Sequence, residues 1–402
     1  MSVLLLISAL LLYILGGYLL FNVGYLFLFS VAGHLRPAAT KAGSAKFGTP
    51  MRRMCVLMPA YQADAVICET ALTAVQHRYA GHADVHVIAD GLQPATVQAL
   101  RQQGAGVVEV SFVKSTKGKA LLAALDSLPA EAYDVAVILD VDNVMSAGFL
   151  DQVNGEMATG SRVVQGHRTA KNLDSPFAVL DACNEEINNH IFRQGHVSLG
   201  MSSALIGSGM AFDYQYLHQL LRDIGETPGE DKELEFKILK DQTKIAYLPS
   251  AHVYDEKIPN SKVFTAQRTR WLAAQQEFLR KYFLEGLRQL GRGNTDFADK
   301  VLQVLLLPRI LLLGLLGVSL VLSLWWAPGP GPVFWLVLLA STVAALLIAL
   351  PRRLYTKQVG KSLLYLPVAL GAMILALLQM RKAKTSFMHT PHAASGPSSS
   401  LL

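Results

Sequence analysis

The feature that most restricts how this chain can fold is an almost uninterrupted apolar run from Val3 to Ala32. About 20 such residues suffice for a helix to cross the hydrocarbon core of a bilayer. No basic residue precedes the run, whereas Arg36, Lys41 and Lys46 follow it. Because cytoplasmic flanks carry the excess of Lys and Arg, the sequence predicts a transmembrane anchor over residues 1–33, with the chain that follows in the cytoplasm.

More apolar segments lie near the other end of the chain. Ile310–Trp326 and Val333–Leu350 are separated by a stretch of Pro and Gly, which predicts two transmembrane helices within residues 301–350. A further apolar segment, Ser362–Met380, has basic residues on both sides. If it crossed the membrane, its basic tail would lie outside, against the positive-inside rule. We therefore predict an interfacial helix over residues 361–380, with a crossing helix as the alternative.

The overall composition agrees with a chain that lies partly in lipid. Hydrophobic residues make up 51% of the sequence and charged residues only 16%. The net charge of +6 is modest and gathers beside the apolar segments, which favours a membrane surface over nucleic acid as a partner. Cys55, Cys68 and Cys183 show no paired spacing, so we expect reduced thiols facing the cytoplasm. These features predict a multi-pass protein of the cell (inner or plasma) membrane.

Short apolar runs of strand length recur after residue 54 and alternate with helix-length segments. They are Cys55–Met58, Val85–Ala89, Val107–Phe112 and the run that starts at Val135. This alternation predicts an α/β domain over residues 50–265 with a parallel, Rossmann-like sheet. Each run ends in polar or turn-forming residues. Because ligands bind beyond the carboxyl ends of such strands, these four ends should line one crevice.

The fourth run leads directly into two carboxylates. Five apolar residues, Val135–Leu139, are followed by Asp140, Val141 and Asp142. Hard cations such as Mg²⁺ are held by one or two carboxylates together with substrate phosphates. Two carboxylates one residue apart at a strand end could therefore share a cation and its ligand. Taken alone, the same pattern also fits an acidic turn.

Three other polar clusters have a functional and a structural interpretation. Asp90 ends the second run, where its carboxylate could accept hydrogen bonds from a nucleobase or ribose, or could cap a helix. Lys117 and Lys119, on either side of Gly118, suit a diphosphate or a solvated charge cluster. Asp231 lies near the start of a predicted helix, where it could act as a cap or as a general base.

The segment Gln267–Trp271 lies in an amphipathic helical region, residues 266–300, that we expect in the headgroup plane of the membrane. Arg268 and Arg270 offer fixed donors for phosphate oxygens. The indole of Trp271 offers a flat apolar face for a sugar ring. Interfacial anchoring is the alternative interpretation, because Arg and Trp also favour lipid headgroups.

Taken in order, these motifs resemble those of the processive, membrane-embedded family 2 glycosyltransferases, which include cellulose, hyaluronan, chitin and poly-N-acetylglucosamine synthases. The family signature is an Asp after the second strand, a D-x-D, a T/G-E-D and a Q-x-x-R-W. The matching residues here are Asp90, Asp140–Asp142, Gly229–Asp231 and Gln267–Trp271. The resemblance covers roughly residues 54–290 and the flanking helices.

The resemblance implies a GT-A fold and an inverting, metal-dependent hexosyltransferase that uses a UDP-sugar with Mg²⁺ or Mn²⁺. Its product would be a growing β-linked polysaccharide. The implied roles are donor binding for Ala60, Tyr61, Asp90, Lys117, Asp140, Gln267, Arg268 and Arg270, metal binding for Asp142, general base for Asp231, and acceptor binding for Gly209, Met210 and Trp271.

The tail, residues 381–402, is similar to the F-x-V-T-x-K gating loop of bacterial cellulose synthase. Phe387 and Thr390 match that pattern, whereas His389 replaces the Val and His392 replaces the Lys. The resemblance therefore implies a gating role for Phe387, Thr390 and His392. A disordered tail is the alternative.

The number of predicted spans departs from the family. We predict three, whereas cellulose and hyaluronan synthases use more helices to form their channel. The chain would need a second copy or an export partner to move polymer, or would not translocate it. Two other functions stay open: a non-processive transferase that adds one sugar to a lipid or lipid-linked acceptor, and an inactive scaffold of a polysaccharide-export complex. Expected partners are a UDP-sugar, a glycan or lipid acceptor and the bilayer, with no nucleic acid.

Overall fold

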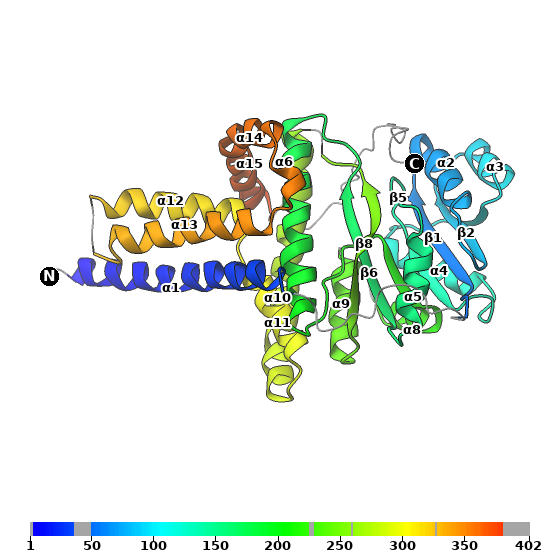
Figure 1. The fold of residues 1–402 in the computed structure, drawn as a ribbon, viewed down its shortest axis with the longest axis horizontal. Coiled ribbons are helices and arrows are strands. Elements are labelled where there is room, and N and C mark those ends of the chain that lie inside the picture. Colours follow the sequence, from blue (N-terminus) through cyan, green and yellow to red (C-terminus); the bar gives the residue numbers. More distant parts are fainter. Residues whose placement is uncertain (1–2, 36–49, 225–228, 259, 326–327, 381–402) are drawn as a thin grey trace.

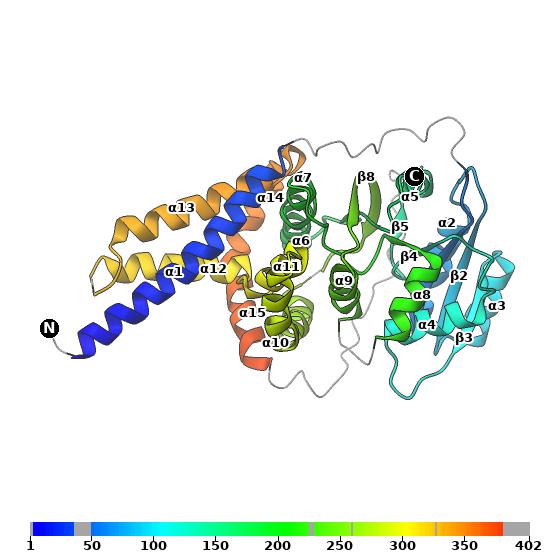
Figure 2. The same ribbon diagram turned by 90° about the horizontal axis from the view of Figure 1, so that it is seen from below.

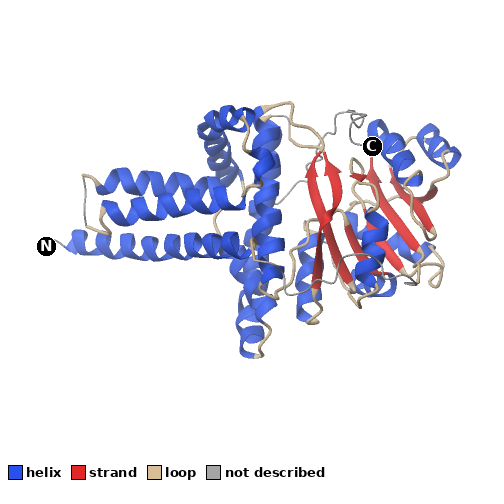
Figure 3. Ribbon diagram, viewed as in Figure 1, coloured by secondary structure: helices blue, strands red, loops and turns tan. Residues whose placement is uncertain are grey.

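The computed structural model describes residues 3–35, 50–224, 229–258, 260–325 and 328–380. Its helices and strands form two parts along the long axis of the molecule (Figure 1). Three helices project from one end, and an α/β domain occupies the other. A layer of helices stands between the two parts and across the direction of the projecting helices (Figures 1 and 3).

The α/β domain is built on one eight-stranded sheet with the order β3-β2-β1-β4-β7-β6-β8-β5. Its strands are β1 (Met54–Tyr61), β2 (Ala83–Asp90), β3 (Gly106–Val110), β4 (Val135–Ile138), β5 (Val144–Met145), β6 (Val163–Ala170), β7 (Met210–Asp213) and β8 (Ile245–Asp255). The predicted strands appear as β1 to β4, and these four are parallel. The prediction of a parallel sheet fails beyond them, because β7 runs antiparallel to both β4 and β6. The sheet is therefore mixed.

The continuous apolar run in β4 is explained by burial on both faces of the sheet. Val135 and Val137 pack into one hydrophobic cluster, whereas Ala136 and Ile138 pack into the cluster on the opposite face. All four side chains are fully buried. A strand covered on both sides needs apolar residues at every position, so its polar residues can begin only where it ends.

Helices cover both faces of the sheet and connect it to the rest of the chain (Figures 1 and 2). They are α2 (Asp64–Val75), α3 (Pro94–Gln102), α4 (Lys117–Ser127), α5 (Phe149–Met157), α6 (Pro176–Asn188), α7 (His196–Ser198), α8 (Tyr214–Arg222), α9 (Glu230–Lys240), α10 (Ser261–Gly291) and α11 (Thr295–Leu305). A π-helical segment, η1 (Asn189–Gly195), joins α6 to α7 without a break. The resulting continuous helix stands across the ends of the projecting helices (Figure 1).

The projecting helices are α1 (Val3–Ala32), α12 (Arg309–Ser323) and α13 (Pro332–Ala349). In length and composition α1 and α13 could cross a membrane, as could the segment Lys357–Gln379. The helix α12 passes the same test only together with α11, from which it is bent by 56°.

The segment Lys357–Gln379 comprises α14 (Lys357–Ser362), η3 (Leu363–Tyr365) and α15 (Leu366–Gln379), and follows η2 (Arg352–Leu354). Helix α15 packs along α10 and against α12. It runs across the direction of α1 and α13 in both ribbon views (Figures 1 and 2). That orientation suits an interfacial helix, and its placement in the interface stays a prediction.

The helix α1 is joined to the α/β domain by polar contacts at its C-terminal half. The Tyr25 hydroxyl lies 2.8 Å from both Asp299 Oδ1 and His196 Nε2. Two side chains of η1 reach the last carbonyls of α1: His190 Nε2 is 2.8 Å from Ser30 O, and Gln194 Nε2 donates to Gly33 O at 2.7 Å. These carbonyls lack partners within their own helix, so the α/β domain caps α1.

Candidate active site

The first cluster of the site lies where α4 meets the loop after β4. Lys117 is the first residue of α4, and its Nζ contacts Asp140 Oδ1 and donates to Gly207 O at 2.7 Å. Burial opposes the charged form of Lys117. The Asp140, Glu230 and Asp231 carboxylates outweigh that effect and hold the pKa of Lys117 above its usual value. Lys117 is therefore a fixed cation among three carboxylates.

Asp231 joins this cluster from α9. That helix begins after Gly229, and Asp231 is its second residue. A Cβ atom on Gly207 would lie 3.8 Å from Asp231 Oδ2, so the Asp231 carboxylate faces the same loop that Lys117 contacts. Gly207 has a left-handed backbone (φ +88°), which favours glycine at this point. The structure thus brings Lys117, Asp140 and Asp231 together from three separate elements.

Asp142 lies beside a carboxylate that the sequence did not indicate. The side-chain amide of Asn143 is oriented with its nitrogen toward two carboxylates and its oxygen toward Ser208. The nitrogen donates to Asp142 Oδ1 at 2.8 Å and to Asp255 Oδ1 at 3.1 Å, and the oxygen accepts from Ser208 Oγ at 2.8 Å. Burial, followed by the Asp255 and Asp140 carboxylates, raises the pKa of Asp142 to about 8. Carboxylates crowded in this way disfavour one another's ionised form.

These residues fit a divalent cation whose coordination is completed by a substrate. A cation between Asp142 and Asp255 would relieve the repulsion between their carboxylates. Among the residues that the structure describes, no group of three or more His, Cys, Asp or Glu side chains could hold a metal ion. Phosphate oxygens would therefore have to supply further ligands, as they commonly do for Mg²⁺.

Asp90 lies at the end of β2, opposite Tyr61 in β1. The Asp90 side chain is buried, and its Oδ2 has no hydrogen-bond partner among the described residues. A buried carboxylate oxygen without a partner is costly, so this atom is suited to accept a hydrogen bond from a ligand. Ala60, also a predicted donor contact, is buried beside Tyr61.

The predicted segment Gln267–Trp271 lies in the first half of α10 and faces α6. Arg268 Nη2 donates to Asp181 Oδ1 on α6 at 2.6 Å, and its guanidinium stacks on the Trp271 ring at 4.0 Å. Gln267 Oε1 is buried without a partner among the described residues. The Trp271 side chain is exposed. Arg270 is more buried, and this burial lowers the pKa of its guanidinium.

A buried ionic network, absent from the sequence prediction, connects α6 to the carboxylates. Glu185 Oε2 on α6 lies 2.9 Å from Arg168 and 3.1 Å from Lys257. Lys257 Nζ in turn lies 2.7 Å from Asp255 Oδ2. Arg168 and Asp255 are also within 3.6 Å of each other. The network therefore extends from the neighbourhood of Arg268 to the carboxylate beside Asp142.

The predicted acceptor residues Gly209 and Met210 lie at the start of β7. Gly209 N donates to Ile138 O at 2.9 Å, and a Cβ atom there would lie 2.9 Å from Val253. The Met210 side chain is buried in the core. The predicted gating residues Phe387, Thr390 and His392 lie outside the described residues.

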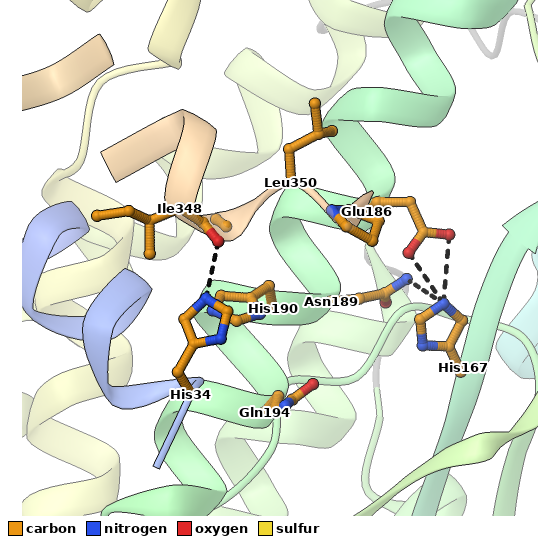
Figure 4. A pocket seen from close by; sticks show the side chains of 10 residues that line it. His34, His167, Glu186, Asn189, His190, Gln194, Ile348 and Leu350 are labelled. Atoms are coloured by element: carbon orange, nitrogen blue, oxygen red, sulfur yellow. Dashed lines mark hydrogen bonds and ion pairs between the residues drawn. The ribbon is translucent and has the colours of Figure 1, made fainter. Parts of the chain in front are cut away.

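A pocket of about 200 Å³ lies elsewhere, between the ends of α1 and α13 and the π-helical segment (Figure 4). Its polar lining includes His34, His167, Glu186 and His190. His167 Nε2 lies 3.1 Å from Glu186 Oε2, and His34 Nε2 lies 2.9 Å from Ile348 O. None of the predicted site residues lines this pocket.

Comparison with known protein families shows that residues 51–274 match the family described as "Glycosyltransferase like family 2". No curated protein sequence matches the chain. A mannosyltransferase from Pyrobaculum calidifontis, solved in complex with GDP-Man and Mn²⁺, has a similar structure with a TM-score of 0.51 and 16% identity over 92% of this chain and 98% of its own. At that identity the likeness shows the fold, which is GT-A.

A second solved structure, glucosyl-3-phosphoglycerate synthase from Mycobacterium tuberculosis with Mn²⁺, UDP and glucosyl-3-phosphoglycerate, gives a TM-score of 0.39 at 20% identity. It covers 59% of this chain and 83% of its own.

Proposed function

This chain belongs to the glycosyltransferase-like family 2, and from that premise we propose that it is an inverting, metal-dependent transferase that moves a hexose from a UDP-sugar to an acceptor at the membrane surface. The observation that carries the proposal is the convergence of Lys117, Asp140 and Asp231 at the Gly207 loop. These residues are far apart along the chain. Their meeting supplies a cation for phosphate and a carboxylate for proton transfer in one place.

The donor would lie across the carboxyl ends of β1, β2 and β4. Asp90 Oδ2, which has no hydrogen-bond partner among the described residues, would accept a hydrogen bond from the uridine, beside Tyr61. Lys117 would lie next to the diphosphate, where its fixed ammonium group stabilises negative charge. In the described structure Lys117 contacts Asp140, so donor binding would share or replace that contact.

The metal would be held by Asp142 together with Asp255, which face the same amide nitrogen of Asn143. When bound, Mg²⁺ or Mn²⁺ neutralises charge on the diphosphate leaving group. The sequence motif alone indicated Asp142. The neighbouring Asp255 makes a site of two carboxylates that phosphate oxygens could complete.

Asp231 would act as the general base. Its carboxylate accepts the proton of the acceptor hydroxyl while that oxygen forms a bond to the anomeric carbon and the bond from this carbon to the diphosphate oxygen breaks. UDP leaves from the face opposite the attack, so an α-linked donor gives a β-linked product. The N-terminus of α9 lies beside the donor cluster, which suits this role.

Two acceptors fit the proposal. A growing polysaccharide is the acceptor that the family resemblance favours, with the α/β domain in the cytoplasm and the product passing the membrane with the help of a second copy or an export partner. A lipid or lipid-linked acceptor is favoured by the few candidate spans, three helices or up to four with the bent pair α11–α12. Product size separates the two, because a polymer gives a ladder on a gel and a single addition does not.

The test uses the purified full chain in lipid nanodiscs with Mn²⁺ and each of UDP-glucose, UDP-N-acetylglucosamine and UDP-glucuronate. We expect release of UDP from at least one donor, and loss of that release when the metal is chelated. Binding of UDP without turnover of any of the three donors would favour an inactive scaffold in a polysaccharide-export complex.

A further inference from the structure

Arg309, the first residue of α12, is a cation whose hydrogen-bond partners are neutral side chains and a carbonyl. Its Nη2 donates to Asn184 O at 3.1 Å, to Asn184 Oδ1 at 2.5 Å and to Asn188 Oδ1 at 2.7 Å, all on α6. Its Nη1 is buried and makes no hydrogen bond within the part of the chain that the structure describes. No carboxylate among the described residues forms an ion pair with Arg309. Buried charges in proteins are usually paired.

Arg268 lies within electrostatic range of Arg309 and repels it. Its guanidinium is held between the Phe264 and Trp271 rings, at 4.8 and 4.0 Å. It has one carboxylate partner, Asp181, and its Nε is buried without a hydrogen-bond partner among the described residues. Two guanidinium groups at the junction of α6, α10 and α12 therefore each keep a donor atom unused.

The cations around this junction share few carboxylates. Glu185 interacts electrostatically with five of them: Arg168, Arg193, Lys257, Arg268 and Arg309. Asp181 and Asp255 form ion pairs within this group, and Asp142 and Glu235 lie within range of Arg168 and Arg193. Asp140 also lies within range of Arg168, but Lys117 pairs with it. None of these described carboxylates forms an ion pair with Arg309, which has only the shared attraction of Glu185.

We propose that the phosphate group of a membrane lipid binds at this junction, between Arg268 and Arg309. The guanidinium fork matches phosphate oxygens, and one phosphate group would give Arg309 the anionic partner that no described carboxylate supplies. Arg309 begins a helix of the projecting bundle, so the junction lies at the depth of lipid headgroups if that bundle crosses the membrane. This inference rests on the proposed function and specifies its acceptor as a lipid that carries phosphate.

The junction is connected to the proposed reaction centre. Asp181 and Glu185 are one turn apart on α6, and Glu185 contacts Lys257, which contacts Asp255. Asp255 is beside Asp142, the predicted metal ligand. Ion pairs and hydrogen bonds therefore connect the junction to the carboxylates of the proposed metal site.

The experiment measures binding of short-chain lipids to the full chain in phosphatidylcholine nanodiscs by native mass spectrometry. The probes are dioctanoyl phosphatidic acid, dioctanoylglycerol, which lacks the phosphate, and inorganic phosphate. We expect phosphatidic acid to bind at least about tenfold more tightly than the other two, since charge-assisted bonds of this kind are strong. Arg309→Gln and Arg268→Gln should each remove about tenfold of that affinity.

The matched control is Arg352→Gln, because Arg352 is an exposed arginine near the same end of the projecting bundle. It should bind phosphatidic acid as the unaltered chain does. Equal losses in Arg309→Gln and Arg352→Gln would mean that general surface charge attracts the lipid, and would overturn the proposal. Equal affinity for phosphatidic acid and dioctanoylglycerol would do the same. Inorganic phosphate binding as tightly as the lipid would assign the site to a free anion and exclude a lipid.

Two further measurements separate a loss of lipid binding from a loss of folding and from a failure of the proposed function. The thermal unfolding midpoint shows whether Arg309→Gln folds, and Arg309→Lys, which keeps the charge but loses the fork, should bind phosphatidic acid more weakly than the unaltered chain. UDP release from the UDP-sugar is followed on the same samples. If UDP release persists but Arg309→Gln binds phosphatidic acid as tightly as the unaltered chain, the lipid inference alone is wrong. If no donor is turned over, the proposed function is wrong while the lipid measurement still stands.

Discussion

The half of the sheet formed by β1 to β4 and the half formed by β6 to β8 hold their charged groups in different arrangements. At the ends of β2 and β4, the polar side chains are mainly carboxylates, and Lys117 is the cation among them. Beside β6 and β8, toward α6, Arg168, Lys257 and Arg268 form ion pairs with Glu185 and Asp181. The first arrangement suits a divalent cation with its phosphate ligand, whereas the charged groups of the second mostly neutralise one another.

The two halves also differ in where their partners come from. Asp90 is the last residue of β2, and Asp140 and Asp142 lie in the short loop after β4. Arg168, Glu185 and Lys257 meet from a strand, a helix and a loop that are far apart in sequence. Strand ends therefore determine where the charged side chains of one half of the site lie, and packing between distant elements determines it for the other half. Four variants test this division.

The largest effect is expected for Asp231→Asn, which probes the chemistry of the cluster that Asp231 forms with Lys117 and Asp140. An amide cannot accept the acceptor proton, so the rate of sugar transfer should fall by about 10²–10⁴-fold. Binding of the UDP-sugar, measured by calorimetry, should change little. A variant that transfers sugar at the original rate would remove Asp231 from the role of base.

Lys300→Met tests whether α9 depends on buried pairs from outside the sheet. Lys300 Nζ on α11 lies 2.5 Å from Glu235 Oε1 on α9, and both side chains are almost fully buried. The substitution leaves Glu235 buried without its partner, so the free energy of unfolding should fall by about 3–5 kcal/mol. The double variant Glu235→Gln/Lys300→Met should lose less. Similar losses in single and double variants, measured by denaturation in detergent, would contradict this reasoning.

Asp255→Asn tests the boundary between the halves, because Asp255 belongs to β8 but lies beside Asp142. If both carboxylates hold the cation, affinity for Mn²⁺ should fall on the order of 10–100-fold. Electron paramagnetic resonance of free Mn²⁺ gives that affinity without an assay of turnover. Asp126→Asn is the control, since Asp126 pairs with His218 on the outer side of α4 and α8. Equal Mn²⁺ affinity in the two variants would exclude Asp255.

The smallest effect is expected for Arg53→Gln. Arg53 and Asp134 form an ion pair at the opposite end of β1, and both side chains are largely exposed. Because solvent screens such pairs, the denaturation midpoint and the transfer rate should stay within measurement error. A clear loss of either would show that this exposed ion pair, at the other end of β1 and β4 from the site, also contributes to stability or activity.

How much could be predicted from the sequence follows the same division. The fully buried run Val135–Ile138 fixes a strand and places Asp140 and Asp142 just beyond it. Gly229 and Asp231 likewise stand at the start of a helix, as predicted. These features depend on neighbours in the sequence, so their periodicity is visible in one chain.

The second half could not be predicted because its pairs have no local signal. Asp255 ends β8 much as Asp90 ends β2, but only the pairing of β8 with β5, the short strand that follows Asn143, shows that Asp255 lies beside Asp142. The sequence predicts Arg268 at the donor diphosphate, whereas in the structure Arg268 forms an ion pair with Asp181 on α6. That ion pair depends on how α10 crosses α6, which a sequence pattern does not specify. The donor role of Arg268 stays a prediction.

The capping of α1 by the α/β domain has a consequence for how this protein can be made and handled. Removing α1 would take the Tyr25 hydroxyl from Asp299 and His196, and would uncover the side of η1 where Gly195 meets Phe29 O. A trimmed, water-soluble version of the enzyme should therefore aggregate. During synthesis α1 leaves the ribosome long before the surface that receives it exists, so the docking of α1 belongs to a late step of folding.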